Sequence, residues 1–279
     1  MKKGYKLIAI DMDGTLLTSD KTIHEDSVRD IQAAVDEGIR IVYCTGRALS
    51  EMQFYFDILP MVRYAVCYSG AVLYDCAEGK CIYRAEIEQS YTMKLVETAR
   101  KYKAMVHFMT MEESIVASDD IVRMDDFHMG LYRGLFEEVT RQVDDMEEEG
   151  KRHDAIAKIN IYFLSAEDRD KGYEELKKFP LTFAYAEETG LEMNAENVTK
   201  ATGLARLLEY LDIPVGQSAG IGDADNDKEM LRTVGFPVAM GNACEDIKEL
   251  CDFVTEDNDH NGVGKAIRHI MSLGDRGGK

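Results

Sequence analysis

The sequence has 279 residues, of which 45% are apolar and 30% charged, a balance that suits a globular protein and excludes a disordered or fibrous chain. At about 150 residues per domain, this length predicts roughly two domains. The 33 basic and 52 acidic residues give a net charge of -19, which would repel nucleic acid and anionic lipid. We therefore expect no nucleic-acid partner, and any phosphate site must be built locally from a cation, helix N-termini or a few basic side chains.

No apolar run reaches the roughly 18 residues that a membrane-spanning helix needs, and the run 7–10 is too short for the core of a signal peptide. We therefore expect a cytoplasmic protein with no membrane partner. The six cysteines show no CxxC pair and no histidine spacing suited to zinc, so we interpret them as inert free thiols. The oligomeric state is left open.

A strand, a helix and a second strand are predicted at the start of the chain. Residues 6–10 form an apolar run that stops at an acidic turn, as a buried parallel strand does when it ends at a site. A capping box and an apolar stripe predict a helix within residues 22–38, and the apolar run 39–44 predicts the second strand. Because parallel strands joined by a crossover helix end at one edge of a sheet, the loops after Ile10 and Cys44 should be neighbours.

The middle of the chain has a different character. Residues 64–75 are typical of a strand, a glycine turn and another strand. From 84 to 190, helical stretches near 90–102, 136–149 and 166–178 are interleaved with strand-like runs at 104–110, 114–118, 155–163 and 181–186. This mixture predicts an α+β insert. After it, the α/β pattern returns with a leucine stripe at 204–211 and a short strand at 218–222.

Two aspartates follow the first predicted strand. Asp11 and Asp13 stand at alternate positions in Asp-Met-Asp-Gly-Thr, where Gly14 allows the chain to turn sharply. At this spacing, one carboxylate can attack an electrophile and hold a metal while the other gives and takes protons. The alternative is an Asx-rich turn with no catalytic role.

Two further features could bind an oxyanion. Thr45-Gly46-Arg47, after the second predicted strand, supplies a hydroxyl, a backbone amide that Gly46 leaves accessible, and a helix N-terminus. The alternative is an ordinary strand-to-helix turn capped by Thr45. Lys200 precedes the leucine-striped helix and could neutralise a phosphate, although a lone lysine at such a place is usually solvated.

The loop after the strand at 218–222 is acidic. Residues 222–227, Gly-Asp-Ala-Asp-Asn-Asp, place three carboxylates and a carboxamide within five positions, which is destabilising unless a cation compensates. The calcium pattern of a helix-loop-helix fails, because Lys228 stands at its glycine position and Val234 at its final glutamate position. Magnesium, held by few carboxylates together with waters and a substrate phosphate, fits this loop better.

In this order, Asp-Met-Asp-Gly-Thr, Thr-Gly-Arg, Lys200 and Gly-Asp-Ala-Asp-Asn-Asp resemble the four motifs of the haloacid dehalogenase superfamily of phosphotransferases. The insert between the second and third motifs resembles that of its Cof-type subgroup of sugar-phosphate and related phosphatases. The resemblance spans residues 6–268 and includes Gly-Asn-Ala near 241 and Asn-Gly-Val at 261. It departs at Ser69-Gly70-Ala71, where the subgroup usually has Asn-Gly-Ala, so an amide contact is missing there.

The resemblance implies roles for individual residues. Asp11 would be the nucleophile that becomes an aspartyl phosphate, and Asp13 would protonate the leaving oxygen and then activate water. Magnesium would be bound by the Asp11 carboxylate, the Asp13 backbone carbonyl and Asp223, with Asp227 supporting the metal's waters. Four groups would hold the phosphoryl oxygens: Thr45, Gly46, Lys200 and Asn226. A cation and donors of this kind lower the barrier by neutralising charge on the transferring group.

We therefore predict an α/β protein with a doubly wound parallel, Rossmann-like sheet core and an inserted α+β cap domain. The core would comprise residues 1–83 and 191–279, and the cap, residues 84–190, would close over the catalytic edge and select the substrate. The predicted function is that of a magnesium-dependent phosphatase of small soluble phosphomonoesters, with sugar phosphates as the favoured class.

Two alternatives stay open at this point. A phosphomutase of the same superfamily, similar to phosphomannomutase, would use the same two aspartates but move the phosphoryl group within a sugar. Its mark would be dependence on a hexose bisphosphate. A non-catalytic, metal-binding regulatory protein would keep the fold, but it has no need of a nucleophile such as Asp11 beside an acid such as Asp13. The side chains of the cap loops decide the substrate, and they follow no sequence code.

Overall fold

The computed structural model describes residues 4–275, and these divide into two compact units. The first unit contains the described residues up to 46, then 54–83 and those from 199 onward. The second unit contains residues 47–53 and 84–198. Each unit has its own sheet and its own apolar core.

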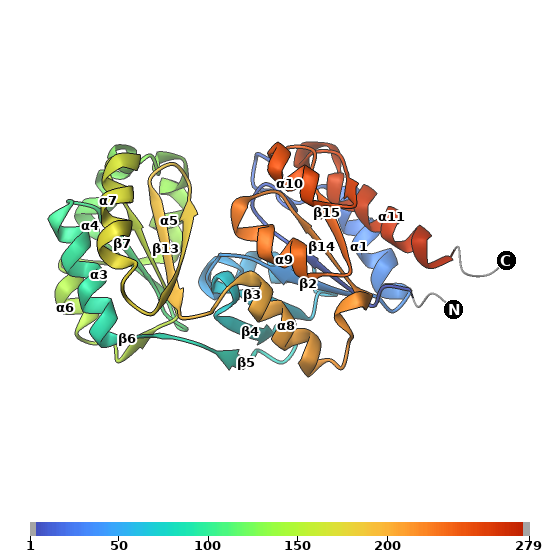
Figure 1. Cartoon of the computed structure of the whole chain (residues 1–279), viewed down its shortest axis with the longest axis horizontal. Helices are drawn as coiled ribbons and strands as arrows, with labels where there is room; N and C mark the ends of the chain where they lie inside the picture. Colours follow the sequence, from blue (N-terminus) through green and yellow to red (C-terminus); the bar gives the residue numbers. More distant parts are fainter. Residues whose placement is uncertain (1–3, 276–279) are drawn as a thin grey trace. The chain divides into compact units, whose positions relative to one another are not determined.

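An eight-stranded sheet organises the first unit, in the order β16-β15-β14-β1-β2-β3-β4-β5 (Figure 1). The strands are β1 (Leu7–Ile10), β2 (Arg40–Cys44), β3 (Tyr64–Cys67), β4 (Val72–Asp75), β5 (Lys80–Arg84), β14 (Ser218–Gly222), β15 (Phe236–Ala239) and β16 (Phe253–Val254). Neighbours from β16 to β3 pair in parallel, whereas β4 runs antiparallel to β3. The expected Rossmann-like core is confirmed, with an antiparallel edge that the sequence did not specify.

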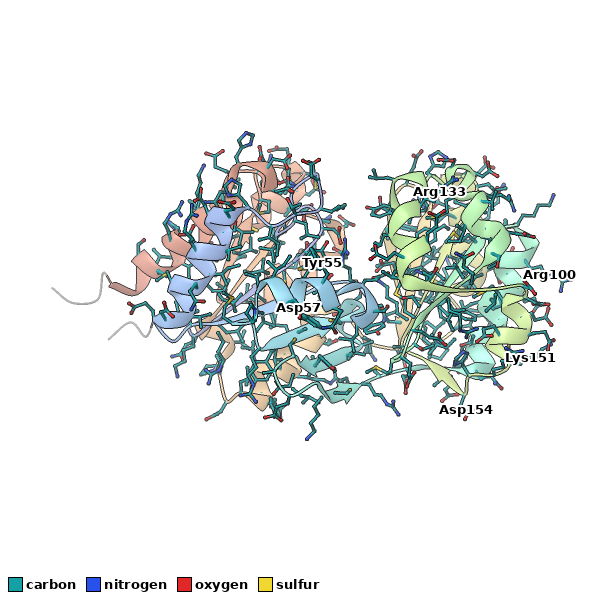
Figure 2. The ribbon with its side chains drawn as sticks, turned by 180° about the vertical axis from the view of Figure 1, so that it is seen from behind. Tyr55, Asp57, Arg100, Arg133, Lys151 and Asp154 are labelled. Carbon is teal, nitrogen blue, oxygen red and sulfur yellow. The ribbon has the colours of Figure 1, made fainter. Side chains whose placement is uncertain are left out.

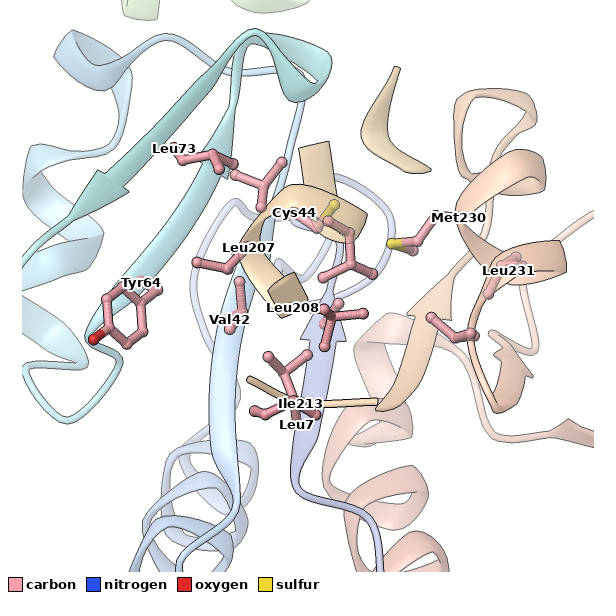
Figure 3. Packing of buried hydrophobic residues seen from close by; sticks show 14 of the residues in the cluster. Leu7, Val42, Cys44, Tyr64, Leu73, Leu207, Leu208, Ile213, Met230 and Leu231 are labelled. Atoms are coloured by element: carbon pink, nitrogen blue, oxygen red, sulfur yellow. The ribbon is translucent and has the colours of Figure 1, made fainter. Parts of the chain in front are cut away.

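Helices cover both faces of this sheet. They are α1 (Glu25–Asp36), α2 (Gln53–Ile58), α8 (Lys200–Tyr210), α9 (Lys228–Thr233), α10 (Glu245–Leu250) and α11 (Gly262–Asp275). Tyr55 and Asp57 lie on α2 (Figure 2). On one face, Leu7 and Val42 of the strands pack against Leu207 of α8 (Figure 3). Helices α1 and α11 lie side by side and contact β2 and β14, respectively (Figure 1).

The strand order reverses at β1, which lies between β14 and β2. Ile10, the last residue of β1, aligns with Ile221 of β14 and with Tyr43 of β2. The loops after these three strands therefore lie at the same edge of the sheet. In doubly wound folds this point of reversal is where ligands bind. The expectation that the loops after Ile10 and Cys44 are neighbours is confirmed.

A six-stranded sheet in the order β12-β13-β11-β7-β8-β9 organises the second unit. Its strands are β7 (Met105–Met109), β8 (Ser114–Ala117), β9 (Thr140–Val143), β11 (Lys158–Tyr162), β12 (Leu181–Ala186) and β13 (Gly190–Ala195), and a separate pair joins β6 (Ile87–Glu88) to β10 (Ala155–Ile156). The α-helices are α3 (Gln89–Lys101), α4 (Ser118–Val122), α5 (Arg133–Val139), α6 (Met146–Gly150) and α7 (Ala166–Leu176). Phe108 and Ile159 of the sheet share an apolar cluster with Leu95 of α3 and Leu176 of α7.

The second unit differs from the sequence prediction in one helix and in one boundary. The single helix expected at 136–149 is wrong: β9 separates α5 from α6, because the stretch containing Thr140 and Val143 pairs with β8. The unit also extends past the expected boundary at 190, because β13 pairs with β11 and β12. Glu147 of α6 forms ion pairs with Arg100 of α3 and with Lys151, both labelled in Figure 2.

All six cysteines are free, and Cys44 and Cys67 are buried at the ends of β2 and β3. Among residues 4–275, no helix is both long and apolar enough to cross a membrane.

Candidate active site

Three aspartates from distant parts of the sequence converge at the carboxyl edge of the first unit's sheet. Asp11 follows β1 directly, whereas Asp223 and Asp227 belong to the loop after β14. One carboxylate oxygen from each of the three lies within 4.8 Å of the others. Asp11 and Asp227 are buried, and Asp223 is partly buried. The parallel pairing of β1 with β14 brings these groups together.

The ammonium group of Lys200 compensates part of their charge. Its Nζ lies 2.6 Å from Asp11 Oδ1, 2.8 Å from Asp227 Oδ1 and 3.5 Å from Asn226 Oδ1. Burial opposes the charge on this lysine, but the carboxylates of Asp11 and Asp227 raise the pKa of Lys200 well above its usual value. Lys200 is therefore a buried cation in the site, and not the solvated lysine that its position before a helix first suggested.

Two glycines allow the start of α8, and with it Lys200, to approach the turn after β3. A Cβ at Gly70 would collide with the carbonyl oxygen of Thr199, and a Cβ at Gly203 would lie 2.7 Å from Gly70 Cα. Thr199 is the N-cap of α8 and accepts a hydrogen bond from the backbone N–H of Thr202. The backbone on both sides of Lys200 is thereby held in place.

The same turn contains the residue at which the motif departs from its subgroup. Tyr68, Ser69 and Gly70 all have positive φ values, of 53°, 54° and 103°. The side chain of Ser69 is buried, and its backbone N–H donates to the carbonyl of Thr45 at 3.0 Å. Asparagine adopts this left-handed conformation more readily than serine, so the departure at position 69 carries a backbone cost.

Thr15 and Gly14 determine how Asp223 is oriented. Thr15 Oγ1 donates to Asp223 Oδ1 at 2.6 Å. Gly14 has a φ of 75°, and a Cβ there would collide with the other carboxylate oxygen of Asp223. Burial raises the pKa of Asp223 to about 6, and the hydrogen bond from Thr15 acts in the opposite direction. Thr15 lies within the first motif, but its contact with Asp223 is not predictable from the sequence, because the two residues are far apart in the chain.

Asp227 anchors the acidic loop. Its Oδ2 accepts hydrogen bonds from the backbone N–H groups of Asp223 and Ala224, at 3.1 and 3.2 Å, while its Oδ1 faces Lys200. These bonds hold the loop segment that carries Asp223. Asp225, to which no role was assigned, is exposed and pairs with Lys228 at 2.5 Å.

Asp13 lies at the side of this cluster and is partly exposed. Its Oδ1 is 2.8 Å from Nζ of Lys21, a residue that no sequence motif singled out. Thr45 is buried directly after β2, and its backbone N–H donates to the carbonyl of Val66, while Gly46 follows it at the same edge. Direct contacts therefore join Asp11, Lys200, Asn226 and Asp227, and the sheet places Thr45 and Gly46 beside them.

The cluster has the composition of a site for a hard divalent cation. Asp11 and Asp227 share the single charge of Lys200, so net negative charge stays buried there. Burial first, and the charge of Asp227 next, raise the pKa of Asp11 well above its usual value, while Lys200 opposes the shift. Magnesium prefers oxygen ligands and offsets charge of this kind. The residues present therefore fit a magnesium ion.

A buried carboxylate beside a buried lysine and an acidic loop, at the switch point of a doubly wound sheet, is typical of a site for phosphoryl transfer. The sequence matches the haloacid dehalogenase-like hydrolase family over residues 8–267. The chain belongs to this family, and its resemblance to the Cof-type subgroup is confirmed.

The chain is similar to characterised and solved proteins over nearly its full length. Phosphatase YwpJ of Bacillus subtilis (strain 168) is 28% identical, with 95% of this chain and 100% of the relative covered. The 5-amino-6-(5-phospho-D-ribitylamino)uracil phosphatase YcsE of the same strain is 28% identical over 95% of each chain. A solved haloacid dehalogenase-like hydrolase from B. subtilis has a TM-score of 0.84 at 27% identity, covering 95% of this chain and 99% of the other. The protein is an enzyme, a phosphoric monoester hydrolase of this family.

Proposed function

We propose that the protein hydrolyses small soluble phosphomonoesters, with sugar phosphates as the favoured class, through an aspartyl phosphate at Asp11 and with magnesium as cofactor. The observation that carries this proposal is the buried pair in which the Asp11 carboxylate lies 2.6 Å from the Lys200 ammonium, at the sheet's carboxyl edge. A buried carboxylate costs free energy. Its position beside a cation and an acidic loop suits a group that has to bind and attack a phosphoryl centre.

The proposed reaction has two halves. In the first, a carboxylate oxygen of Asp11 attacks phosphorus, the bond from phosphorus to the leaving oxygen breaks, and Asp13 donates a proton to that oxygen. In the second, Asp13 takes a proton from water, the water oxygen attacks phosphorus, and inorganic phosphate leaves with Asp11 restored. Asp13 is suited to serve both halves because it lies beside the cluster and is partly exposed to water.

Part of the charge on the transferring group would be neutralised by side chains and backbone groups of the protein. Lys200 lies in contact with both Asp11 and Asn226, so its ammonium and the Asn226 amide are suited to hold phosphoryl oxygens. Thr45 and Gly46 would supply a hydroxyl and backbone N–H donors from the neighbouring loop.

The magnesium ion would be held by the carboxylates of Asp11 and Asp223 and by the backbone carbonyl of Asp13, with Asp227 supporting the metal's waters. When bound, it supplies positive charge that stabilises the transferring phosphoryl group. The hydrogen bonds of Asp223 to Thr15 and of Asp227 to the loop backbone would keep this donor set in place.

We propose that the second unit, whose larger part is residues 84–198, acts as the cap and selects the substrate. Every proposed site residue belongs to the first unit, and a loop-rich second domain commonly controls access in enzymes of this architecture. The name of the relative YcsE includes a phosphorylated ribityl group, which supports a sugar or polyol phosphate as the substrate class. We expect the enzyme to act in the cytoplasm, and its net charge of -19 argues against a nucleic-acid partner.

A phosphate-release screen over sugar phosphates, nucleotides and cofactor phosphates, with and without magnesium, tests this function. Asp11→Asn should abolish release while the fold persists, because the amide has nearly the same shape but cannot attack phosphorus. Asp57→Asn, at an exposed position on α2 (Figure 2), is the matched control and should keep full activity. Phosphate release by Asp11→Asn free of host phosphatase would contradict the covalent mechanism, and an isomerised product that requires a hexose bisphosphate would identify a mutase.

A further inference from the structure

The segment after the first motif forms a short hairpin that ends beside Asp13. The backbone N–H of Thr18 donates to the carbonyl of Thr22 at 2.8 Å, and the N–H of Lys21 donates to the carbonyl of Thr18 at 2.9 Å. Lys21 itself has a φ of 59°, a left-handed conformation that a lysine adopts only when its surroundings require it. The turn therefore holds Lys21 in one backbone conformation.

The side chain of Lys21 contacts the carboxylate of Asp13. Lys21 Nζ lies 2.8 Å from Asp13 Oδ1, and the side chains are 36% and 37% exposed. Ion pairs with this much exposure contribute little to the free energy of folding. This pair therefore does not offset the cost of the strained turn, and a role in orienting Asp13 accounts for the arrangement better than a role in stability.

Side chains from three other parts of the first unit hold the hairpin. From α2, the hydroxyl of Tyr55 donates to the carbonyl of Lys21 at 3.2 Å (Figure 2 shows Tyr55 on this helix). From the loop after β16, the Asn258 amide donates to the carbonyl of Leu17 at 2.9 Å, and the Asp259 carboxylate accepts from the backbone N–H and the hydroxyl of Ser19, both at 2.7 Å.

The loop after β15 supplies the third support. The amide of Asn242 donates to the carbonyl of Gly14 at 2.8 Å, and its Oδ1 accepts from the backbone N–H of Asn258 at 3.2 Å. Gly14 is the residue that follows Asp13. The backbone is therefore fixed directly after Asp13 by Asn242, and further along the hairpin by Asn258.

We propose that Lys21 is a positioning residue that orients the Asp13 carboxylate for proton transfer to the leaving group, with Asn242 and Asn258 holding the hairpin that carries it. The proposal rests on the proposed function, in which Asp13 is the proton donor. Proton transfer requires a donor at hydrogen-bond distance and in the correct direction, and a partly exposed aspartate samples several rotamers unless a partner selects one. Lys21 acts through Asp13 and needs no contact with the substrate.

The test compares two esters that differ in their need for a proton donor. Alkyl leaving groups, such as the alcohol of a sugar phosphate, have to be protonated as they leave, whereas para-nitrophenolate leaves without a proton. Lys21→Met should lower kcat/KM at least about tenfold for the best sugar phosphate of the screen, which is a part of the roughly 10²–10⁴-fold that general acid catalysis contributes. The same variant should lower kcat/KM for para-nitrophenyl phosphate less than about threefold.

Three further variants complete the test. Lys21→Arg, which keeps the cation, should retain most of the sugar-phosphate activity. Asn258→Ala should show the same dependence on the leaving group, to a smaller degree, because it loosens the hairpin without touching Asp13. Lys265→Met removes a half-exposed lysine paired with Glu256 elsewhere in the unit and should change neither ester. Thermal unfolding of every variant shows whether the fold persists.

If Lys21→Met loses kcat/KM equally on both esters, or loses it on neither, the role proposed for Lys21 is wrong. The proposed function would not be affected by that result. A wild-type enzyme that hydrolyses neither ester would instead overturn the proposed function, and the role of Lys21 with it. Should Lys21→Met not fold, Lys21→Gln removes the same charge with a polar side chain and is judged by the same ratio of the two esters.

Discussion

The backbone of Gly70 packs against the carbonyl group of Thr199 so closely that no side chain fits between them. This contact joins the turn after β3 to the N-terminus of α8, whose first residue is Lys200. The position of the buried ammonium group therefore depends on a glycine that has no side chain to take part in the chemistry.

Gly70→Ala should destabilise the first unit by about 2–4 kcal/mol, because it adds a collision with Thr199 to the cost of a left-handed alanine. Gly38→Ala is the matched control: Gly38 has a φ of 82° but no atom within 4 Å of its added Cβ, so it should cost only about 1 kcal/mol. Urea unfolding measures both. Equal costs would mean that the close approach to Thr199 does not determine the effect.

Lys200→Met should have a larger effect on both stability and activity. The substitution leaves two buried carboxylates without their cation, and breaking a buried ion pair in this way costs about 3–5 kcal/mol. Phosphatase activity should fall by roughly two orders of magnitude or more, because a charge on the transferring group is no longer neutralised. Lys94→Met, at an exposed lysine paired with Glu97, should change stability by less than about 0.5 kcal/mol. Urea unfolding measures the effect on stability, and phosphate release measures the effect on activity. A Lys200→Met protein as stable and as active as the Lys94→Met control would contradict the prediction.

The sheet edge and its aspartates could be predicted because their signals are local. Short apolar runs end at Asp11 and at the acidic loop. Because the two strands pair in parallel, the loops that follow them lie at the same edge of the sheet. The hydrogen bond from Thr15 to Asp223 and the ion pair of Lys21 with Asp13 could not be predicted. Each depends on the path of a loop, for which the sequence carries no periodic signal.

The second unit was harder to predict for a different reason. Its strand β13 contains polar residues that are buried, among them Glu192, which forms an ion pair with the buried Lys158 of β11 at 2.8 Å. Polar side chains at alternate positions look like an exposed strand face or a loop in the sequence. Only the pairing partner shows that they are compensated inside the unit.

The buried His107 of β7 should make the free energy of unfolding of the second unit depend on pH. It is fully buried, and neither of its ring nitrogens has a hydrogen-bond partner among residues 4–275. Burial, followed by the charge of Lys158, lowers the pKa of His107 to about 3. Because the folded pKa lies below the unfolded value of about 6.5, stability is complete above pH 6.5 and is lost as the pH falls towards 3.

Replacing His107 should therefore make the second unit less sensitive to acid. At about 1.4 kcal/mol per pH unit, the stability of His107→Leu relative to wild type should be about 2 kcal/mol more favourable at pH 5 than at pH 7.5. His260→Leu, at an exposed position, controls for the loss of a histidine. Denaturant unfolding at the two pH values measures the free energy of unfolding of each protein. If the free energy of His107→Leu relative to wild type is the same at both pH values, His107 becomes protonated in the folded protein.

Substitutions in the turn between β7 and β8 test the proposal that the second unit selects the substrate. The turn is built on Thr110, whose hydroxyl accepts from the backbone N–H groups of Glu112 and Glu113. Substitutions within Met111–Ser114 should change the order of kcat/KM among sugar phosphates, but they should change para-nitrophenyl phosphate much less, because it is small. A uniform loss across all substrates would indicate that the hairpin serves stability only.

The acidic loop offers a test of the metal that does not depend on turnover. A ligand that binds only the folded state stabilises it by about 2.7 kcal/mol when its concentration is a hundred times its Kd, so magnesium should raise the Tm of the wild-type protein. Asp223→Asn removes a carboxylate from the cluster of three and should abolish most of this shift. Asp225→Asn changes a neighbouring carboxylate that is exposed and paired with Lys228, so it should leave the shift unchanged. Calorimetric titration with magnesium alone gives the affinities of all three proteins. Equal magnesium-dependent shifts in the two variants would mean that the ion does not bind at Asp223, and stable wild-type activity in excess chelator would remove the need for the ion altogether.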